Sequence, residues 1–199
     1  MPLVRRNDTA MRILDVALRL VQVQGFNAFS YADVSAELRI TKASLHHHFP
    51  TKAALGKALI TRYTESFLAA LTGIDAGGGD PLSKLRDYAE IYVSVLRQER
   101  MCLCGMLAAD FETLPKPMRA SVTEFFRLNE EWLSRVLDEG RRAGALRFEG
   151  APAATAAFLV SSLEGAMLVA RSFGGVAKLE SVVETLLTSL GVKGTRSVS

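Results

Sequence analysis

Two short helical segments joined by only three residues constrain this fold more than any other feature of the sequence. Apolar spacing predicts one helix over residues 31–38, with Ser30 as its N-cap and Asp33 in its first turn, and a second over residues 42–47. An earlier helix ends at Gly25, and its apolar face contains Ile13, Leu14, Ala17, Leu18 and Val21. Three helices in this order, with a tight turn between the last two, predict a helix-turn-helix unit.

The rest of the chain shows helical periodicity as well. Further helices are predicted over residues 52–71, 81–98, 101–112, 115–143, 152–173 and 176–190, with prolines near starts and glycines near ends. No strand is indicated, so the predicted fold is all-α with about nine helices. The glycine-rich stretch 73–80 is predicted to link a head domain, residues 1–72, to a second domain, residues 81–191. Residues 192–199 are expected to be a disordered tail.

The excess positive charge lies in the head domain. Residues 1–72 contain nine lysines and arginines against five acidic residues, whereas residues 81–199 contain 15 against 14. A basic head next to a nearly neutral second domain is the distribution that a phosphate-binding protein requires.

Other function classes lack support in the sequence. No apolar run is expected to span a bilayer, which takes about 20 residues, and no secretory signal pattern is present, so the protein is predicted to be cytoplasmic. The only cysteines, Cys102 and Cys104, are too close in sequence for an unstrained disulfide and too few for a zinc site. All three histidines lie at 46–48, so no catalytic set accompanies either thiol, and neither an enzyme nor a cofactor is expected.

The second short helix is the predicted DNA reader, because this helix of a helix-turn-helix unit enters the major groove. Leu45 is expected to pack inward, which leaves the polar side chains of the helix facing DNA. Their hydroxyl, ammonium and imidazole groups suit bases and phosphates. With the starts of the two neighbouring helices, the predicted DNA-binding residues are Ser30, Tyr31, Thr41, Lys42, Ser44, His46, His48 and Lys52.

The three consecutive histidines also raise the possibility of a metal site. Successive residues of a helix point about 100° apart, so these side chains do not converge on one ion, and no metal is expected. His47 and Phe49 are expected to be packing residues rather than base readers.

Three segments of the head resemble the TetR/AcrR family of transcriptional regulators. They are Gly25-Phe26, the stretch from Phe29 to Val34, and the run from Ile40 to Leu55. The resemblance is strong over residues 10–60 and extends beyond them through helix order and length. It implies an all-helical homodimer with an N-terminal DNA-binding head and a C-terminal effector and dimerisation domain.

Two residues of the head depart from the family pattern. Arg39 occupies a turn position where the family usually has glycine, so a left-handed backbone there would store about 1 kcal/mol of strain. His46 stands where the family favours tyrosine. An imidazole can still bind a phosphate, but it offers less stacking area.

The resemblance implies an effector pocket among the helices from about residue 81 to 170. Tyr88 and Tyr92 share one helix face, and the absence of a conspicuous charge cluster favours a neutral or apolar effector. The same stripe of aromatic residues and methionines is also typical of plain core. The candidate ligand-binding residues are Tyr88, Tyr92, Met106, Phe111, Phe125, Leu128, Trp132 and Met167.

The segment around Cys102 resembles a family branch in which a cysteine at this position responds to electrophiles or oxidants. A position near a helix start, with Arg100 close by, favours the reactive thiolate. The alternative is that Cys102 and Cys104 are small buried apolar residues.

The last two long helices are the predicted dimer interface. Small and apolar residues share one broad face, and two such helices from each chain would form a four-helix bundle. An intramolecular core is the alternative. The predicted interface residues are Phe158, Ser162, Gly165, Val169, Leu179, Val183 and Leu186.

These features together predict a homodimeric repressor that a small apolar effector releases from a palindromic DNA operator. A thiol sensor acting through Cys102 is the alternative, and a ligand-independent architectural DNA binder is the third hypothesis.

Overall fold

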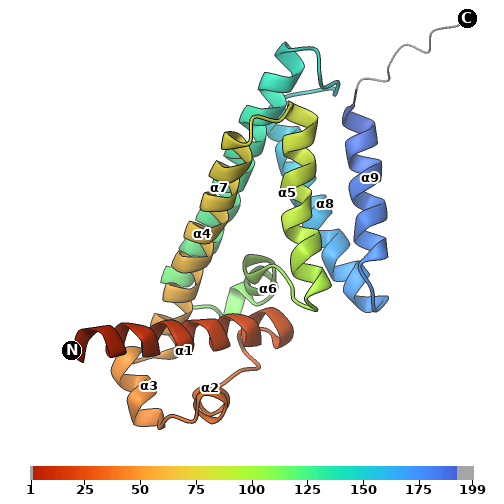
Figure 1. The fold of residues 1–199 in the computed structure, drawn as a ribbon. Coiled ribbons are helices and arrows are strands. Elements are labelled where there is room, and N and C mark those ends of the chain that lie inside the picture. The colour runs from red at the N-terminus through yellow and green to blue at the C-terminus, as the bar shows by residue number, and fades with distance from the viewer. Residues whose placement is uncertain (1, 192–199) are drawn as a thin grey trace, which may run out of the picture. The chain divides into compact units, whose positions relative to one another are not determined.

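A computed structural model describes residues 2–191, with side chains from Asp8 onward. Within this range the chain is all-α, as predicted, and contains nine α-helices, one short 3-10 helix and no strand (Figure 1). Their bounds are α1 Pro2–Gln24, α2 Tyr31–Leu38, α3 Lys42–His48, α4 Lys52–Ala76, α5 Pro81–Arg97, α6 Leu103–Ala109, η1 Phe111–Thr113, α7 Lys116–Arg142, α8 Pro152–Ser172 and α9 Ala177–Leu190.

The chain forms two compact units. Among the described residues, unit 1 contains residues 2–67 and Arg100–Phe125, and unit 2 contains Leu68–Glu99 and residues 126–191. These units divide the chain differently from the predicted head and second domain, because residues 100–125 pack with the head. Helices α4 and α7 each contribute residues to both units.

Unit 1 has a core shared by α1, α2, α3 and the first part of α4. Its completely buried side chains include Ile13, Val34, Leu45 and Leu55. Helix α2 begins where Ser30 accepts a hydrogen bond from the amide of Ala32, while Asp33 accepts one from the amide of Ser30 at 2.6 Å. This reciprocal cap satisfies the free amides that would otherwise fray so short a helix.

Polar contacts tie the end of α1 to the segment around α6, which lies beside α1 (Figure 1). The amide side chain of Gln22, only 3% exposed, donates to the carbonyl of Met101 at 2.9 Å, and the amide of Met101 donates back to the carbonyl of Gln22 at 3.1 Å. Asp110 accepts from the backbone amides of Phe26 and Asn27. These hydrogen bonds pair polar groups at the end of α1 with polar groups of the α6 segment. The α6 segment therefore belongs to the same unit as the head.

Unit 2 buries its core between α5, α8, α9 and the later part of α7. Asp80 caps α5 by accepting from the amides of Leu82 and Ser83, and Pro81 occupies the first turn, where proline is tolerated. Helix α9 contacts both α5 and α8. Arg86 and Arg97 of α5 form ion pairs with Glu184 and Glu180 of α9.

The predicted element boundaries need two adjustments. Helix α4 continues to Ala76 rather than ending near residue 71, so Gly73 is helical and only residues 77–80 lie outside a helix. The predicted helix over 101–112 is divided into α6 and η1, with Asp110 between them. The predicted tail 192–199 lies outside the described residues.

Helix α8 is long and apolar enough to cross a membrane by length and composition alone, with a mean hydropathy of 1.6. The sequence-based expectation that no segment reaches this limit was therefore wrong. Seven of its side chains, among them Leu159 and Met167, are buried inside the chain itself. This burial within unit 2 accounts for the apolar character of one face of the helix.

Candidate DNA interface and regulatory unit

Helix α3 has the form of a DNA-recognition helix. Thr41 caps it, accepting from the amide of Ser44 at 3.1 Å. Leu45 is completely buried, as predicted, and this anchor leaves Thr41, Lys42 and His46 exposed on the outer side. Three exposed side chains with donor groups, on a helix held by one buried leucine, can approach the edges of bases and phosphates.

The turn before α3 is left-handed at Arg39, with φ 55° and ψ 42°. The amide of Arg39 donates to the carbonyl of Ala36, and that of Ile40 donates to the carbonyl of Ser35 at 3.1 Å. These bonds end α2 and reverse the chain within three residues. A side chain in this conformation is strained, so the cost anticipated for Arg39 is present.

The hydroxyls of Ser30 and Tyr31 both donate hydrogen bonds to acceptors within the chain. The Ser30 hydroxyl donates to Asp33 at 2.9 Å as part of the α2 cap. The Tyr31 hydroxyl donates to the carbonyl of Phe49 at 2.7 Å, and burial raises the pKa of Tyr31 to about 12. In this arrangement both hydroxyl hydrogens are committed, so both residues help to position α2 and the end of α3.

Lys52 begins α4 with its ammonium group above two aromatic rings. Its Nζ lies 4.7 Å from the ring centre of Phe26 and 4.5 Å from that of Phe29. Burial lowers the pKa of Lys52, against the carboxylates of Asp110 and Asp33, which raise it. The rings hold this half-buried cation in one place, which is a favourable arrangement for a cation that meets a phosphate.

The three histidines occupy different environments. His46 is exposed, with its Nδ1 3.2 Å from the carbonyl oxygen of Pro50. His48 is half-buried, and its ring packs edge-on against His47. His47 was expected to pack inside but is exposed, because it lies on the side of α3 opposite to its buried leucine. Among the described residues, no three histidine, cysteine, aspartate or glutamate side chains form a metal-binding group.

An open hollow of about 380 Å³ joins these elements of unit 1. It brings together five of the eight predicted DNA-binding residues, from the starts of α2 and α4 and from α3, and leaves Thr41, Ser44 and His48 outside its lining. We call it the head hollow, and the residues that line it are Phe29, Ser30, Tyr31, Ala32, Lys42, His46 and Lys52.

The predicted ligand-binding residues are divided between the two units. Met106, Phe111 and Phe125 belong to unit 1, where Phe125 packs against the rings of Tyr63 and Phe67. The other candidates belong to unit 2; of these, Leu128 is half-buried and Met167 is completely buried.

Three of the unit 2 candidates, Tyr88, Tyr92 and Trp132, lie at a buried polar contact. The hydroxyl of Tyr88 lies 3.0 Å from Oδ1 of Asn129 and 3.1 Å from the hydroxyl of Tyr92, and all three residues are at most 2% exposed. The ring of Tyr88 stacks on Trp132, with centres 5.6 Å apart. Beside Tyr88 lies a cavity of about 10 Å³ with an entirely apolar lining, which is about the space of one water molecule.

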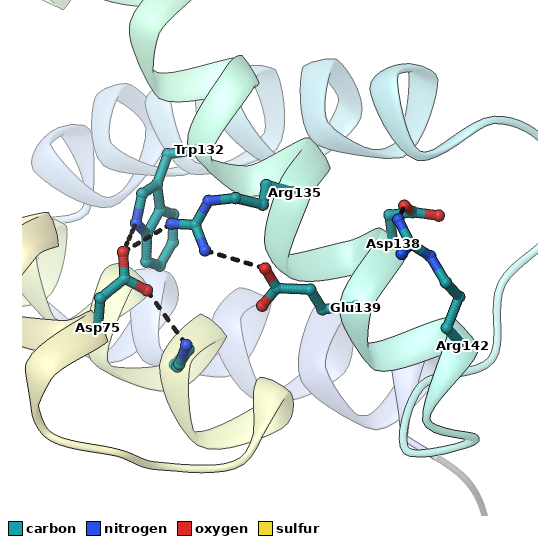
Figure 2. A network of polar contacts seen from close by, with 7 residues as sticks. Asp75, Trp132, Arg135, Asp138, Glu139 and Arg142 are labelled. Atoms are coloured by element: carbon teal, nitrogen blue, oxygen red, sulfur yellow. Dashed lines mark hydrogen bonds and ion pairs between the residues drawn. The ribbon is translucent and has the colours of Figure 1, made fainter.

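Asp75 is a central residue of unit 2 that the sequence patterns did not reveal. It accepts hydrogen bonds from Nε1 of Trp132, from Arg135 and from Lys84, as Figure 2 shows. Arg135 also pairs with Glu139. No signal marked Asp75, because it falls in a glycine-rich stretch that was interpreted as a linker.

Both cysteines are buried in unit 1. Cys102 is 2% exposed and Cys104 is completely buried, and neither forms a disulfide. Cys102 is the N-cap residue of α6, and the hydroxyl of Tyr63 lies 3.6 Å from its sulfur.

The two helices of the predicted dimer interface differ in exposure. On α9, Leu179, Val183 and Leu186 are buried in the chain's own core, so the structure corrects their assignment to the interface: this stripe faces α5 and α8. On α8, by contrast, Gly165 is exposed and Ser162 half-buried within a largely apolar strip. We call its large members, with the C-cap residue Phe173, the α8 stripe: Phe158 (59% exposed), Leu168 (52%), Val169 (46%) and Phe173 (72%).

Comparisons with known proteins agree with this architecture. Residues 13–59 match the family described as "Bacterial regulatory proteins, tetR family", and residues 81–186 match "Tetracyclin repressor-like, C-terminal domain". The second match alone spans more than half of the chain.

Curated relatives and solved structures match along most of their length. The chain is 23% identical to the HTH-type transcriptional repressor DhaR of Mycobacterium sp. (strain GP1), covering 82% of each chain. It is 25% identical to the HTH-type transcriptional repressor NemR of Escherichia coli (strain K12), covering 90% of this chain and 96% of that one. A TetR-family regulator from Agrobacterium tumefaciens superposes with a TM-score of 0.91 at 32% identity, covering 94% of this chain and 100% of the other.

The head is a helix-turn-helix unit with an exposed recognition helix, and the chain matches both family domains and a solved TetR-family structure. This chain is therefore a DNA-binding transcriptional regulator and belongs to the TetR family.

Proposed function

We propose that the protein is a homodimeric repressor that binds a palindromic DNA operator and is released from it when a small apolar effector binds unit 2. The observation that carries this proposal is the exposure of Thr41, Lys42 and His46 along α3. Two copies of this helix, one in each protomer, would read half-sites one helical turn, or a multiple of it, apart. It is expected to act in the bacterial cytoplasm, on DNA, without catalysing a reaction.

The α8 stripe supports the dimer. A monomeric soluble protein seldom exposes several large apolar side chains along one helix, because contact between apolar surface and water is unfavourable. At Gly165, nothing lies within 4 Å of the position that a Cβ would occupy, which leaves room beside the stripe for a second helix to approach closely. Burial of this strip against the same strip of a second copy is the simplest two-fold arrangement.

The apolar character proposed for the effector rests on the interior of unit 2. The small cavity there has no polar lining, and the nearby polar groups of Tyr88 and Asn129 already bond each other. An apolar molecule would replace helix-to-helix contacts without leaving a charge unpaired, whereas a charged one would find no partner. Because about 10 Å³ does not hold an effector, the helices around the cavity would have to separate to admit one. That separation is the conformational difference an effector could favour.

DNA binding to the upstream region of the gene tests the main proposal. Lys42→Ala should weaken binding by about tenfold or more, since Lys42 reaches bases or phosphates. The matched control is Lys116→Ala, which removes an exposed lysine at the start of α7 and should change affinity less than about twofold. Equal losses in the two variants, or equal affinity of the parent protein for a random duplex, would contradict the proposal.

One contact favours the alternative of a thiol sensor. The Tyr63 hydroxyl at 3.6 Å from Cys102 can donate to the sulfur and so stabilise the thiolate. After the thiol loses its proton to water, the thiolate sulfur would add to one carbon of an activated carbon–carbon double bond, and the displaced π electron pair would take up a proton from water at the other carbon. If an electrophile releases DNA from the parent protein and from Cys104→Ser but not from Cys102→Ser, this alternative is correct; equal release from all three excludes it.

The small cavity of unit 2 favours the third hypothesis, a DNA binder without an effector. Fluorescence of Trp132, the only tryptophan, distinguishes it from the main proposal. Apolar compounds that release DNA should also change this emission, because the indole packs against Tyr88 beside the cavity. A broad panel of compounds that changes neither signal would favour the ligand-independent protein.

A further inference from the structure

One histidine, His46, lines the head hollow. We propose that His46 binds a DNA phosphate only in its protonated form, so that DNA affinity rises as the pH falls. This inference rests on the proposed function, because the phosphate belongs to the DNA bound by the head. It starts from the hydrogen bond that His46 makes to Pro50.

This hydrogen bond determines which nitrogen of His46 carries the hydrogen in the neutral ring. Nδ1 lies 3.2 Å from the carbonyl oxygen of Pro50, and a carbonyl oxygen can only accept. Nδ1 is therefore the protonated nitrogen, and Nε2 is left with a lone pair. Since His46 lines the head hollow, Nε2 is the nitrogen that remains for a ligand there.

The protonation state of His46 then decides how the ring interacts with a phosphate. Phosphate oxygens accept hydrogen bonds and carry negative charge, so they are repelled by the lone pair of a neutral Nε2. In the cationic ring both nitrogens donate, and Nε2 can form a charge-assisted hydrogen bond to a phosphate oxygen without giving up the bond to Pro50. Binding is thus coupled to uptake of one proton at each half-site.

The position of the ring is defined by its neighbours. The ring centre of His46 lies 4.8 Å from that of Tyr31, whose hydroxyl is held by the carbonyl of Phe49. Both partner carbonyls, those of Phe49 and Pro50, belong to the turn between α3 and α4. The imidazole is therefore already oriented before DNA arrives, which reduces the entropy lost on binding.

The other charged and titratable groups around the hollow do not reproduce this behaviour. From α2, Tyr31 has a pKa raised to about 12 by burial, and Asp33, whose pKa is lowered by hydrogen bonds from Ser30, stays anionic. Lys42 of α3 and Lys52 of α4 supply positive charge. The turn residues 49–51 contain no titratable side chain.

The direction of the pH effect follows from linkage. The bound state holds more protons than the free state, so DNA affinity falls as the pH rises. With one proton taken up at each half-site, we expect affinity to fall by about fivefold or more between pH 6 and pH 8.

The experiment measures DNA affinity by fluorescence anisotropy from pH 6 to pH 8 at constant ionic strength, for the parent protein, His46→Gln and His47→Gln. Two probes are used in the same low-salt buffer. One is a duplex from the upstream region of the gene, and the other is a random duplex. Phosphate contacts carry no sequence information, so the random duplex reports the His46 contact even without an operator. His47 is the matched control, since it is the next residue of α3 and is also exposed.

The expected result is that the parent and His47→Gln lose affinity with rising pH, whereas His46→Gln binds nearly equally across the range. His46→Gln should match the parent at pH 8 and be weaker at pH 6. A parent protein with pH-independent binding to both probes overturns the inference, as does a pH effect that survives in His46→Gln. If the pH effect depends on His46 on both probes but the two bind equally tightly, the phosphate contact stands and the operator-specific repressor does not.

Discussion

Replacement of Asp75 tests whether the polar contacts at the end of α4 stabilise unit 2. This carboxylate accepts from Nε1 of Trp132 at 3.0 Å, from Nζ of Lys84 at 3.1 Å and from Nη2 of Arg135 at 2.6 Å (Figure 2). The three donors come from α5 and α7. Asp75→Ala removes one acceptor and leaves three donors without it.

The expected cost can be worked out donor by donor. The Trp132 side chain belongs to a residue only 9% exposed, so a stranded indole N–H costs about 1–3 kcal/mol. The Lys84 side chain is 16% exposed, and loss of its partner adds about 1 kcal/mol. Arg135 is 45% exposed and can be rehydrated, so its share is at most about 0.5 kcal/mol. The total is about 3 kcal/mol, or a Tm lower by roughly 6–12 °C.

Urea unfolding followed by circular dichroism and by Trp132 fluorescence measures this cost. Asp75→Asn, which keeps an acceptor but loses the charge, should lose only about 1 kcal/mol. A double-mutant cycle with Trp132→Phe should give a coupling free energy of at least about 1 kcal/mol. If Asp75→Ala unfolds within about 0.5 kcal/mol of the parent protein, the contacts of Asp75 contribute no stability and the reasoning is wrong.

The pH dependence provides an independent check of the same site. Burial works against ionisation of Asp75, but hydrogen bonds from Trp132, Lys84 and Arg135 prevail and lower its pKa. A lowered folded-state pKa means that this stabilisation is present above the ordinary aspartate value of about 3.9 and is lost as the pH falls through the folded-state value. The stability difference between the parent and Asp75→Asn should therefore be full at pH 7 and shrink in acid.

Three further substitutions test other parts of the structure. Arg39→Gly should stabilise the protein by about 1 kcal/mol in urea unfolding, because glycine adopts the left-handed turn without strain, and a loss of stability would contradict this. Gly56→Ala should destabilise the protein by about 1–3 kcal/mol, because a Cβ there would lie 2.5 Å from Cε of Met118. In the control Gly73→Ala, the new Cβ meets nothing within 4 Å, so this substitution should stabilise α4 by up to about 1 kcal/mol. Phe158→Arg, at a position 59% exposed, should shift the protein from dimer to monomer in analytical ultracentrifugation without changing its helix content; an unchanged dimer would exclude the α8 stripe.

Local signals in the sequence were sufficient for the secondary structure of the head. The Ser30 cap and the buried Leu45 each act within one helical turn, so residue type and spacing predicted both short helices. The left-handed backbone at Arg39 had been raised as a condition by the family resemblance, because the family usually has glycine at this position. The family resemblance, which rests on this contiguous run, was predictable for that reason.

Contacts between distant residues could not be predicted in this way. The bond between Gln22 and Met101 and the three donors to Asp75 join residues up to 79 positions apart, and helical periodicity says which side of a helix is apolar but not which partner it meets. The α9 stripe was therefore assigned to a dimer interface although α5 and α8 cover it within the chain. Tertiary packing alone decided which apolar faces are core, and it left the α8 stripe, among the described residues, exposed.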